Sequence, residues 1–196
     1  MVEPRAAVFL DRDGTINEQM GYINHLSRFV LLPGVVAAIR RLNQAGVPVV
    51  VVTNQSGLAR GYFPPALLDQ VHAEMRQRLA EGGARVDGVY VCPHHPEARE
   101  ERYRRACGCR KPRPGLLERA ARELGLDLAR SYMVGDRYSD VATGAAAGCR
   151  TVLVLTGYGR GDYEYIGPRH PCRPDFVAED LGAAVEWILA DLAPSS

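Results

Sequence analysis

Two aspartates, Asp11 and Asp13, directly follow a short apolar run and have the spacing needed for metal and phosphate chemistry. Residues two apart in extended backbone point to the same side, so their carboxylates would share a small space. Two close carboxylates repel each other unless a cation lies between them or one is protonated. Mg²⁺ suits such a site because it takes oxygen ligands from few carboxylates together with water and phosphate. The alternative is that both aspartates only cap a turn.

Polar residues also follow other apolar runs along the chain. Thr53 and Asn54 come after one predicted strand, and Asp136 comes after another. The carboxyl ends of parallel strands meet at one edge of a sheet, where ligands bind. We therefore expect Asp136 to bring a third carboxylate to this edge and Thr53 to offer a hydroxyl to phosphate.

Lys111 directly precedes a predicted helix over 114–124. A lysine beside a helix N-terminus makes a good site for an anion. Together with the backbone amides after Thr53, Lys111 could bind the phosphate. The alternative is an ordinary solvated lysine on the surface, which is the commonest environment of this residue type.

Three cysteines and a histidine lie in one polar loop over 92–109. Such a Cys₃His set fills all four positions of a tetrahedral zinc ion and leaves none for a reacting water, so we expect structural zinc. His95 is an equal candidate for the histidine position, and incidental cysteines are the alternative. The predicted ligands are Cys92, His94, Cys107 and Cys109.

The elements that must position these residues alternate between strand and helix. Continuous apolar runs predict strands at 6–10, 47–52, 86–91, 131–134, 151–155 and 176–177. Helical spacing predicts helices at 35–45, 64–81, 114–124, 140–147 and 181–192. Alternation of buried strands with helices indicates a mostly parallel sheet covered on both faces, a three-layer α/β/α Rossmann-like fold. Residues 157–175 are rich in Gly, Pro and charge and predict a surface loop.

Composition narrows the classes of protein to consider. The 196 residues are 46% hydrophobic, enough for one core, and we expect a single domain over 1–196 that carries the zinc-binding loop. A net charge of +1 gives no reason to expect a nucleic-acid or membrane partner. The five cysteines are an odd number, and residues 1–5 lack a signal-peptide layout, so we expect a cytoplasmic protein without a disulfide framework.

The ordered set of strand-end motifs resembles the four motifs of the haloacid dehalogenase superfamily. The motifs are Asp11-Arg12-Asp13-Gly14-Thr15, Thr53-Asn54, Lys111-Pro112 and Gly135-Asp136-Arg137-Tyr138-Ser139-Asp140. The resemblance implies that Asp11 is a nucleophile that takes up the phosphoryl group. It implies that Asp13 gives a proton to the leaving alcohol and then activates water. A dehalogenase does not need that proton donor, so the resemblance indicates a phosphatase.

The resemblance also assigns the residues around the reacting phosphate. Asp11, the backbone carbonyl of Asp13 and Asp136 would hold Mg²⁺. Thr53 and Lys111 would stabilise charge on the transferring group. Asp140 would orient the site rather than bind the metal.

The zinc loop resembles a capless branch of the superfamily that contains heptose-bisphosphate and histidinol-phosphate phosphatases. The long stretch over 96–106 is similar to the heptose type, which serves the synthesis of activated heptose for the bacterial envelope and its lipopolysaccharide. Two arginines suit a substrate with a second phosphate. The substrate-binding residues that the resemblance implies are Gly21, Tyr22, Asn54, Gln55, Ser56, Arg110 and Arg137.

We therefore expect a Mg²⁺-dependent phosphatase that removes the 7-phosphate of a heptose 1,7-bisphosphate through an aspartyl-phosphate. Histidinol phosphate is the alternative substrate. A zinc-stabilised binding module that has lost catalysis is a rival of another class, although the aspartates and Lys111 are all present. Because no cap domain is inserted, we expect an open site and a monomer that acts on a small molecule.

Overall fold

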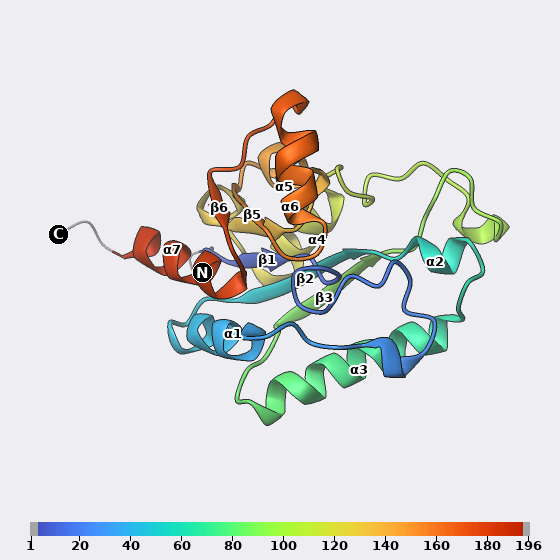
Figure 1. Ribbon diagram of the computed structural model, residues 1–196, viewed down its shortest axis with the longest axis horizontal. Helices are drawn as coiled ribbons and strands as arrows, with labels where there is room; N and C mark the ends of the chain where they lie inside the picture. The colour runs from blue at the N-terminus through green and yellow to red at the C-terminus, as the bar shows by residue number, and fades with distance from the viewer. Residues whose placement is uncertain (1–3, 194–196) are drawn as a thin grey trace.

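The computed structural model describes residues 4–193, so both ends of the predicted domain over 1–196 lie outside the described residues. Six strands form one parallel sheet in the order β3-β2-β1-β4-β5-β6 (Figure 1). They are β1 (Val8–Leu10), β2 (Val49–Asn54), β3 (Gly88–Cys92), β4 (Tyr132–Gly135), β5 (Arg150–Val154) and β6 (Phe176–Ala178). Strands β2 and β3 extend the sheet on one side of β1, and β4, β5 and β6 extend it on the other. β1 therefore lies inside the sheet, where its two halves meet.

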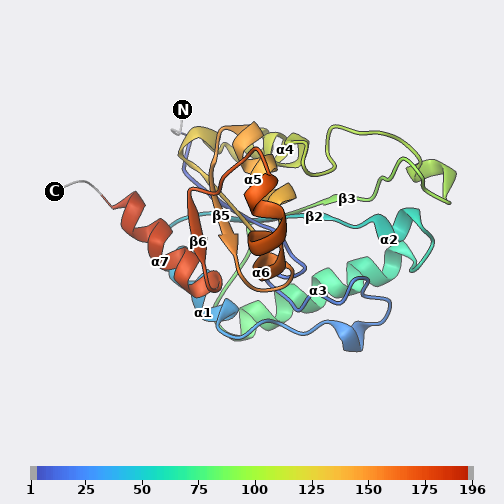
Figure 2. The same ribbon diagram turned by 45° about the horizontal axis from the view of Figure 1, so that its top comes forward.

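Helices cover both faces of this sheet, which confirms the predicted three-layer α/β/α fold (Figures 1 and 2). One face packs against α1 (Val35–Gln44), α3 (Pro65–Glu81) and α7 (Leu181–Leu192). The other face packs against α4 (Gly115–Leu124) and α5 (Tyr138–Ala147). No helix within residues 4–193 combines the length and the apolar character needed to span a bilayer.

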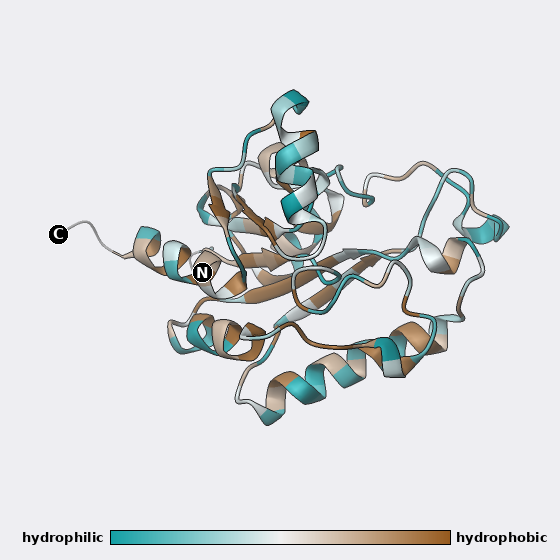
Figure 3. Cartoon of the chain, in the orientation of Figure 1, coloured by the Kyte–Doolittle hydropathy of each residue, from teal (hydrophilic) through white to brown (hydrophobic). Residues whose placement is uncertain are grey.

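The strands are apolar on both sides because each side meets a helical layer, and they are the most hydrophobic part of the chain (Figure 3). In β2, Val49 and Val51 contribute to the core under α1 and α3, whereas Val50 and Val52 contribute to the core under α4. This is the two-residue period of a strand. All four valines are fully buried, as a parallel sheet with two covered faces requires.

Short helical segments fill the connections between the longer elements. They are η1 (Leu26–Arg28), α2 (Ser56–Ala59), η2 (Glu101–Tyr103), η3 (Leu128–Arg130), α6 (Gly159–Gly161), η4 (Asp162–Ile166) and η5 (Gly167–Arg169). The last three lie in the stretch 157–175 that the sequence predicts to be a loop, so that prediction is wrong in part. The Asp162 side chain accepts a hydrogen bond from the Tyr138 backbone at 3.1 Å, which ties η4 to the start of α5.

Helix α5 begins at Tyr138, two residues before the predicted start. The Asp140 carboxylate accepts a hydrogen bond from the Arg137 backbone N–H at 3.1 Å. This contact satisfies a backbone donor at the helix N-terminus, as a capping interaction does. Tyr138 is buried against β5, so tertiary packing fixes the first turn.

Candidate active site

The ends of three neighbouring strands bring the predicted catalytic residues together. In the sheet, Leu10 is in register with Val51 on one side and with Val134 on the other. Asp11 follows β1, Thr53 lies near the end of β2, and Asp136 directly follows β4. The convergence that the sequence predicts therefore exists in the structure, at the carboxyl edge of the sheet.

A pocket of about 310 Å³ opens at this edge. Its lining includes Asp11, Asp13, Thr53 and Lys111, the four residues predicted for catalysis. It also includes all the predicted substrate-binding residues, which are Gly21, Tyr22, Asn54, Gln55, Ser56, Arg110 and Arg137. Asp136 is fully buried and lies outside the lining.

Lys111 is a buried cation between two carboxylates. Its Nζ lies 2.7 Å from Asp11 Oδ1 and 2.7 Å from Asp140 Oδ1, and it donates to the Val52 carbonyl at 3.1 Å. Burial alone would lower the pKa of Lys111, but the charges of Asp11 and Asp140 outweigh it and raise the pKa. Lys111 therefore stays protonated, and the alternative of a solvated surface lysine is wrong.

Oxygens of Asp11, Asp136 and Asp140 lie within 4.8 Å of one another. Burial raises the pKa of Asp11 to about 7, with the charges of Asp140 and Asp13 adding to it and Lys111 opposing. Burial, together with the charges of Asp11 and Asp140, raises the pKa of Asp136 to about 8. Such a cluster of carboxylates favours the binding of a cation, because a cation allows all of them to ionise.

Asp136 offers the clearest sign of a metal ligand. Its Oδ2 accepts from the Tyr158 backbone N–H at 2.8 Å, whereas its buried Oδ1 has no hydrogen-bond partner among residues 4–193. A Cβ at Gly14 or Gly157 would lie 2.0 Å or 2.2 Å from Asp136 Oδ2, and both glycines have positive φ. The backbone thus packs tightly on one oxygen, while the other lacks a partner. The donor set fits Mg²⁺, which prefers oxygen ligands.

The Asp13 side chain does not join this cluster. Arg12 Nη2 donates to both of its oxygens at 2.9 Å, Asn17 donates at 2.9 Å and Gln55 donates at 2.8 Å. Burial would raise the pKa of Asp13, but Arg12, Asn17 and Gln55 outweigh it and lower the pKa. Asp13 is therefore an ionised carboxylate, and only its backbone carbonyl is left as a candidate metal ligand.

Asn54 and Gln55 hold catalytic residues as well as lining the pocket. The Asn54 side chain accepts from the Lys111 backbone N–H at 3.1 Å and donates to the Lys111 carbonyl at 3.3 Å. Gln55 Nε2 donates to Thr53 Oγ1 at 2.9 Å while it also donates to Asp13. These amides therefore fix Thr53, Asp13 and Lys111 relative to one another.

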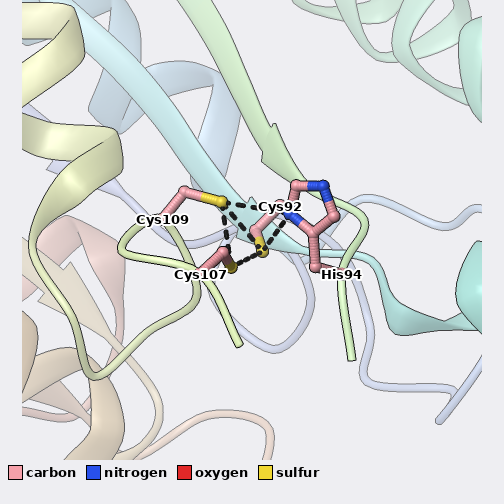
Figure 4. A group of neighbouring side chains, drawn as sticks. All are labelled: Cys92, His94, Cys107 and Cys109. Atoms are coloured by element: carbon pink, nitrogen blue, oxygen red, sulfur yellow. Dashed lines mark hydrogen bonds between the residues drawn. The ribbon is translucent and has the colours of Figure 1, made fainter. Parts of the chain in front are cut away.

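The zinc-type cluster forms as predicted, between the end of β3 and the loop before α4 (Figure 4). The three sulfur atoms lie 3.2 to 3.5 Å apart, and His94 Nδ1 lies 3.4 Å from Cys109 Sγ and 3.8 Å from Cys92 Sγ. Four close soft or borderline ligands fit a closed structural zinc site. The structure brings His94 into this group, whereas His95 points to Arg60.

Three arginines line the pocket. Arg110 donates to the His94 carbonyl at 3.3 Å, and Arg60 Nη2 donates to His95 Nε2 at 3.2 Å. Arg137 stacks over the Tyr158 ring at 4.9 Å. Together with the buried Lys111, these side chains give the pocket a cationic wall beside its carboxylates.

Comparison with known proteins identifies the family. A haloacid dehalogenase-like hydrolase model matches residues 16–145, and a HAD-hydrolase-like model matches residues 108–184. The chain belongs to the haloacid dehalogenase-like hydrolases. This hydrolase is 46% identical to a D-glycero-D-manno-heptose-1,7-bisphosphate 7-phosphatase of Thermosynechococcus vestitus, over 97% of this chain and 99% of that protein. It is 47% identical to a D-glycero-beta-D-manno-heptose-1,7-bisphosphate 7-phosphatase of Salmonella typhi, over 98% and 94%.

Solved structures agree with the sequence relatives. A crystal structure of D,D-heptose 1,7-bisphosphate phosphatase from B. bronchiseptica, complexed with magnesium and phosphate, is 39% identical to this hydrolase and has a TM-score of 0.84. The match covers 95% of this chain and 99% of that one. The enzyme of the same name from Burkholderia thailandensis has a TM-score of 0.70 at 34% identity, over 95% and 99% of the two chains. This hydrolase is thus a close homologue of these phosphatases along nearly its whole described length.

Sequence reasoning missed the buried partner of Asp13 in this hydrolase, Arg12, and the residue that contacts Arg12 in turn, His72. Arg12 is only 1% exposed, and its Nη1 donates to His72 Nε2 on α3 at 3.1 Å. Burial, followed by the charge of Arg12, lowers the pKa of His72 to about 4, so the ring is neutral and can accept. The sequence held a usable signal for Arg12. It is a charged residue beside a run of buried positions, and a buried charge requires a partner. Nothing local to His72 indicates its contact.

Proposed function

We propose that this hydrolase removes the 7-phosphate from D-glycero-D-manno-heptose 1,7-bisphosphate. The observation that carries this proposal is the pocket: a carboxylate cluster with a buried lysine lies at its base, and three arginines line it. A substrate with two phosphates matches this arrangement, because one phosphate can react at the carboxylate cluster while arginines bind the other. Similarity along nearly the whole chain to phosphatases named for this substrate supports the same choice.

Asp11 would attack the phosphorus of the 7-phosphate, form the aspartyl-phosphate and release the sugar oxygen. Lys111 lies 2.7 Å from Asp11 and would stabilise negative charge on the transferring phosphoryl group. Thr53, which the Gln55 amide holds, would donate its hydroxyl to the same group. Asp140 would keep the Lys111 ammonium in place from the opposite side.

Asp13 would give a proton to the leaving sugar oxygen and then take one from the water that attacks the aspartyl-phosphate. Attack of that water on phosphorus breaks the bond to Asp11, releases phosphate and restores the nucleophile. In the protein alone Asp13 is ionised, which suits the second role. A bound phosphate dianion would raise the pKa of Asp13 through like charge, which favours the protonated form needed in the first role.

Asp11, Asp136 and the Asp13 carbonyl would hold Mg²⁺, and Cys92, His94, Cys107 and Cys109 would hold structural Zn²⁺. Bound Mg²⁺ supplies charge neutralisation to the phosphate and keeps the carboxylates ionised. The partnerless buried oxygen of Asp136 supports this assignment. The magnesium and phosphate in the B. bronchiseptica crystal structure support it further.

Steady-state kcat/KM on two substrates tests the proposal. With Mg²⁺, we expect strong preference for D-glycero-D-manno-heptose 1,7-bisphosphate over histidinol phosphate, because a protonated amine would face Arg60, Arg110 and Arg137. Preference for histidinol phosphate would make the alternative substrate correct. Absence of phosphate release from both, and from a panel of other sugar phosphates, would favour a binding module.

We also propose that residues 1–196 act as one phosphatase domain, as a monomer in the cytoplasm. The pocket of one chain contains every predicted catalytic residue, so catalysis does not need a residue from a second copy. The nearly balanced charge gives no basis for a nucleic-acid or membrane partner. The mass of the protein would be measured by light scattering as it elutes from a sizing column, with activity assayed in the same fractions, to test the oligomeric state.

A further inference from the structure

Arg60 lines the same pocket as Asp11 but has no part in the mechanism above. It directly follows α2, on the segment that begins at Thr53. No carboxylate within residues 4–193 lies at ion-pair distance from Arg60 or from Arg110. Lys111, by contrast, is paired with two carboxylates. The pocket therefore contains two arginines whose charges no carboxylate of the described chain neutralises.

The guanidinium of Arg60 is also not saturated by the protein. Its Nη2 donates to His95, whereas its Nε is buried and has no hydrogen-bond partner among the described residues. A buried donor without a partner is costly unless a ligand or water supplies an acceptor. An anion in the pocket, with several oxygens, is the kind of ligand that a guanidinium binds through more than one donor.

The zinc-binding loop holds both arginines in place. Arg60 donates to His95, and Arg110 donates to the carbonyl of the adjacent His94. The backbone of the same loop reaches α2 as well, because Glu100 N–H donates to the Ala59 carbonyl at 3.0 Å. Both views show α2 beside the outer turn of this loop, where η2 lies (Figures 1 and 2).

We infer that Arg60 is a specificity-determining residue that binds the phosphate that is not cleaved, and that the zinc-binding loop positions it through His95. This inference rests on the proposed function, because it needs a substrate with two phosphates. Arg60 and Arg110 come from different segments and would bind the phosphate dianion together by charge-assisted hydrogen bonds. The zinc-binding loop then acts in substrate selection as well as in stability.

The test compares two substrates that differ in one phosphate, D-glycero-D-manno-heptose 1,7-bisphosphate and the 7-phosphate of the same heptose. The quantity measured is the ratio of their kcat/KM values. In Arg60→Gln we expect this ratio to fall about tenfold, as loss of a charge-assisted hydrogen bond predicts. Arg60→Lys, which keeps the charge without the planar fork, is expected to restore part of the ratio. Arg99→Gln, an exposed arginine of the same loop, is the matched control and should keep it.

The outcomes separate this inference from the proposed function. If the unaltered protein does not cleave the bisphosphate, the proposed function is wrong. If it does, and Arg60→Gln keeps the ratio or lowers both kcat/KM values equally, only the role of Arg60 in binding the second phosphate is wrong. His95→Ala should lower the ratio less than Arg60→Gln does. A wild-type ratio in His95→Ala would overturn positioning by the loop.

Discussion

Asp11 and Asp13 are two residues apart, yet their surroundings shift their carboxyl pKa values in opposite directions. Burial and neighbouring carboxylates raise the pKa of Asp11, whereas Arg12 and hydrogen bonds from Asn17 and Gln55 lower that of Asp13. Pairs of carboxyls with opposed environments are typical of active sites in which one group reacts and the other moves protons. The short segment that follows β1 places the two groups, and their partners make them different.

Gln55 is the residue by which this difference can be tested. It donates to Asp13 and to Thr53 and is only 6% exposed. In Gln55→Leu we expect kcat to fall roughly tenfold, a part of the 10²–10⁴-fold that positioned proton transfer contributes. Steady-state kinetics would show it, with Gln70→Leu on the exposed face of α3 as the control. Unchanged kcat in a folded Gln55→Leu protein would contradict a positioning role.

At this scale the sequence predicts that Asp11 and Asp136 lie at one edge of the sheet, because each is a polar residue at the end of an apolar strand. It does not predict Arg60 or His72, which acquire their roles only by contact with segments far along the chain. It also leaves His94 and His95 equivalent as ligands. The difference between them depends on where each ring points after β3, and adjacent residues of extended backbone point in opposite directions.

Among the elements, the zinc-binding loop over 92–109 links the end of β3, α2 and the start of α4. Cys92 is the last residue of β3, and its carbonyl accepts a hydrogen bond from the Gln55 N–H at 2.8 Å. The loop thus reaches the pocket through its backbone and through Arg60 and Arg110. Structural zinc sites contribute directly to folding energy.

Loss of one zinc ligand should therefore destabilise the protein. In Cys109→Ser we expect loss of bound zinc and a lower Tm, by about 2–4 °C for each kcal/mol of stability lost in a chain of this size. Metal analysis and calorimetry on the same samples measure both. Cys172→Ser is the control because Cys172 packs near α5 and β5, away from the cluster. An unchanged Tm in zinc-free Cys109→Ser would contradict a structural role.

The strand and helix order follows from the apolar runs and their spacing, and all six predicted strands are present. The stretch 157–175 is different because its helical turns depend on partners elsewhere. Asp162 accepts from the Tyr138 backbone, and Gly167 approaches the Tyr138 ring so closely that a Cβ would lie 2.4 Å from its hydroxyl oxygen. Gly and Pro content alone indicates a loop, and only these contacts add the helical turns.

For the whole molecule, the carboxylate cluster should cost stability whenever Mg²⁺ is absent. The pKa of Asp11 is raised to about 7 and that of Asp136 to about 8. An acid whose pKa is raised by folding stabilises the folded state only while protonated, so that contribution is lost progressively as the pH rises from the ordinary value of 3.8 to these values. Bound Mg²⁺ reverses the effect because it binds the folded state.

We therefore expect Asp136→Asn to be more stable than the unaltered protein in Mg²⁺-free buffer, with a difference in Tm that grows from about pH 4 to about pH 8. His72 has a lowered pKa and the opposite dependence on pH, but it is common to both proteins and cancels in the difference. Thermal unfolding of both proteins at several pH values, with zinc retained, measures this difference in Tm. Added Mg²⁺ should stabilise the unaltered protein more than Asp136→Asn. A difference that shrinks with rising pH would contradict the charge cluster.

The most direct measurement is the covalent state of Asp11 during turnover. The protein is mixed with D-glycero-D-manno-heptose 1,7-bisphosphate and Mg²⁺, quenched in acid at millisecond intervals, digested, and examined by peptide mass spectrometry. We expect a phosphoryl group on Asp11 before free phosphate is released, and none in Asp11→Asn, which should fold but not turn over. Release of phosphate by Asp11→Asn, or a phosphoryl group found only on another residue, would contradict Asp11 as the nucleophile.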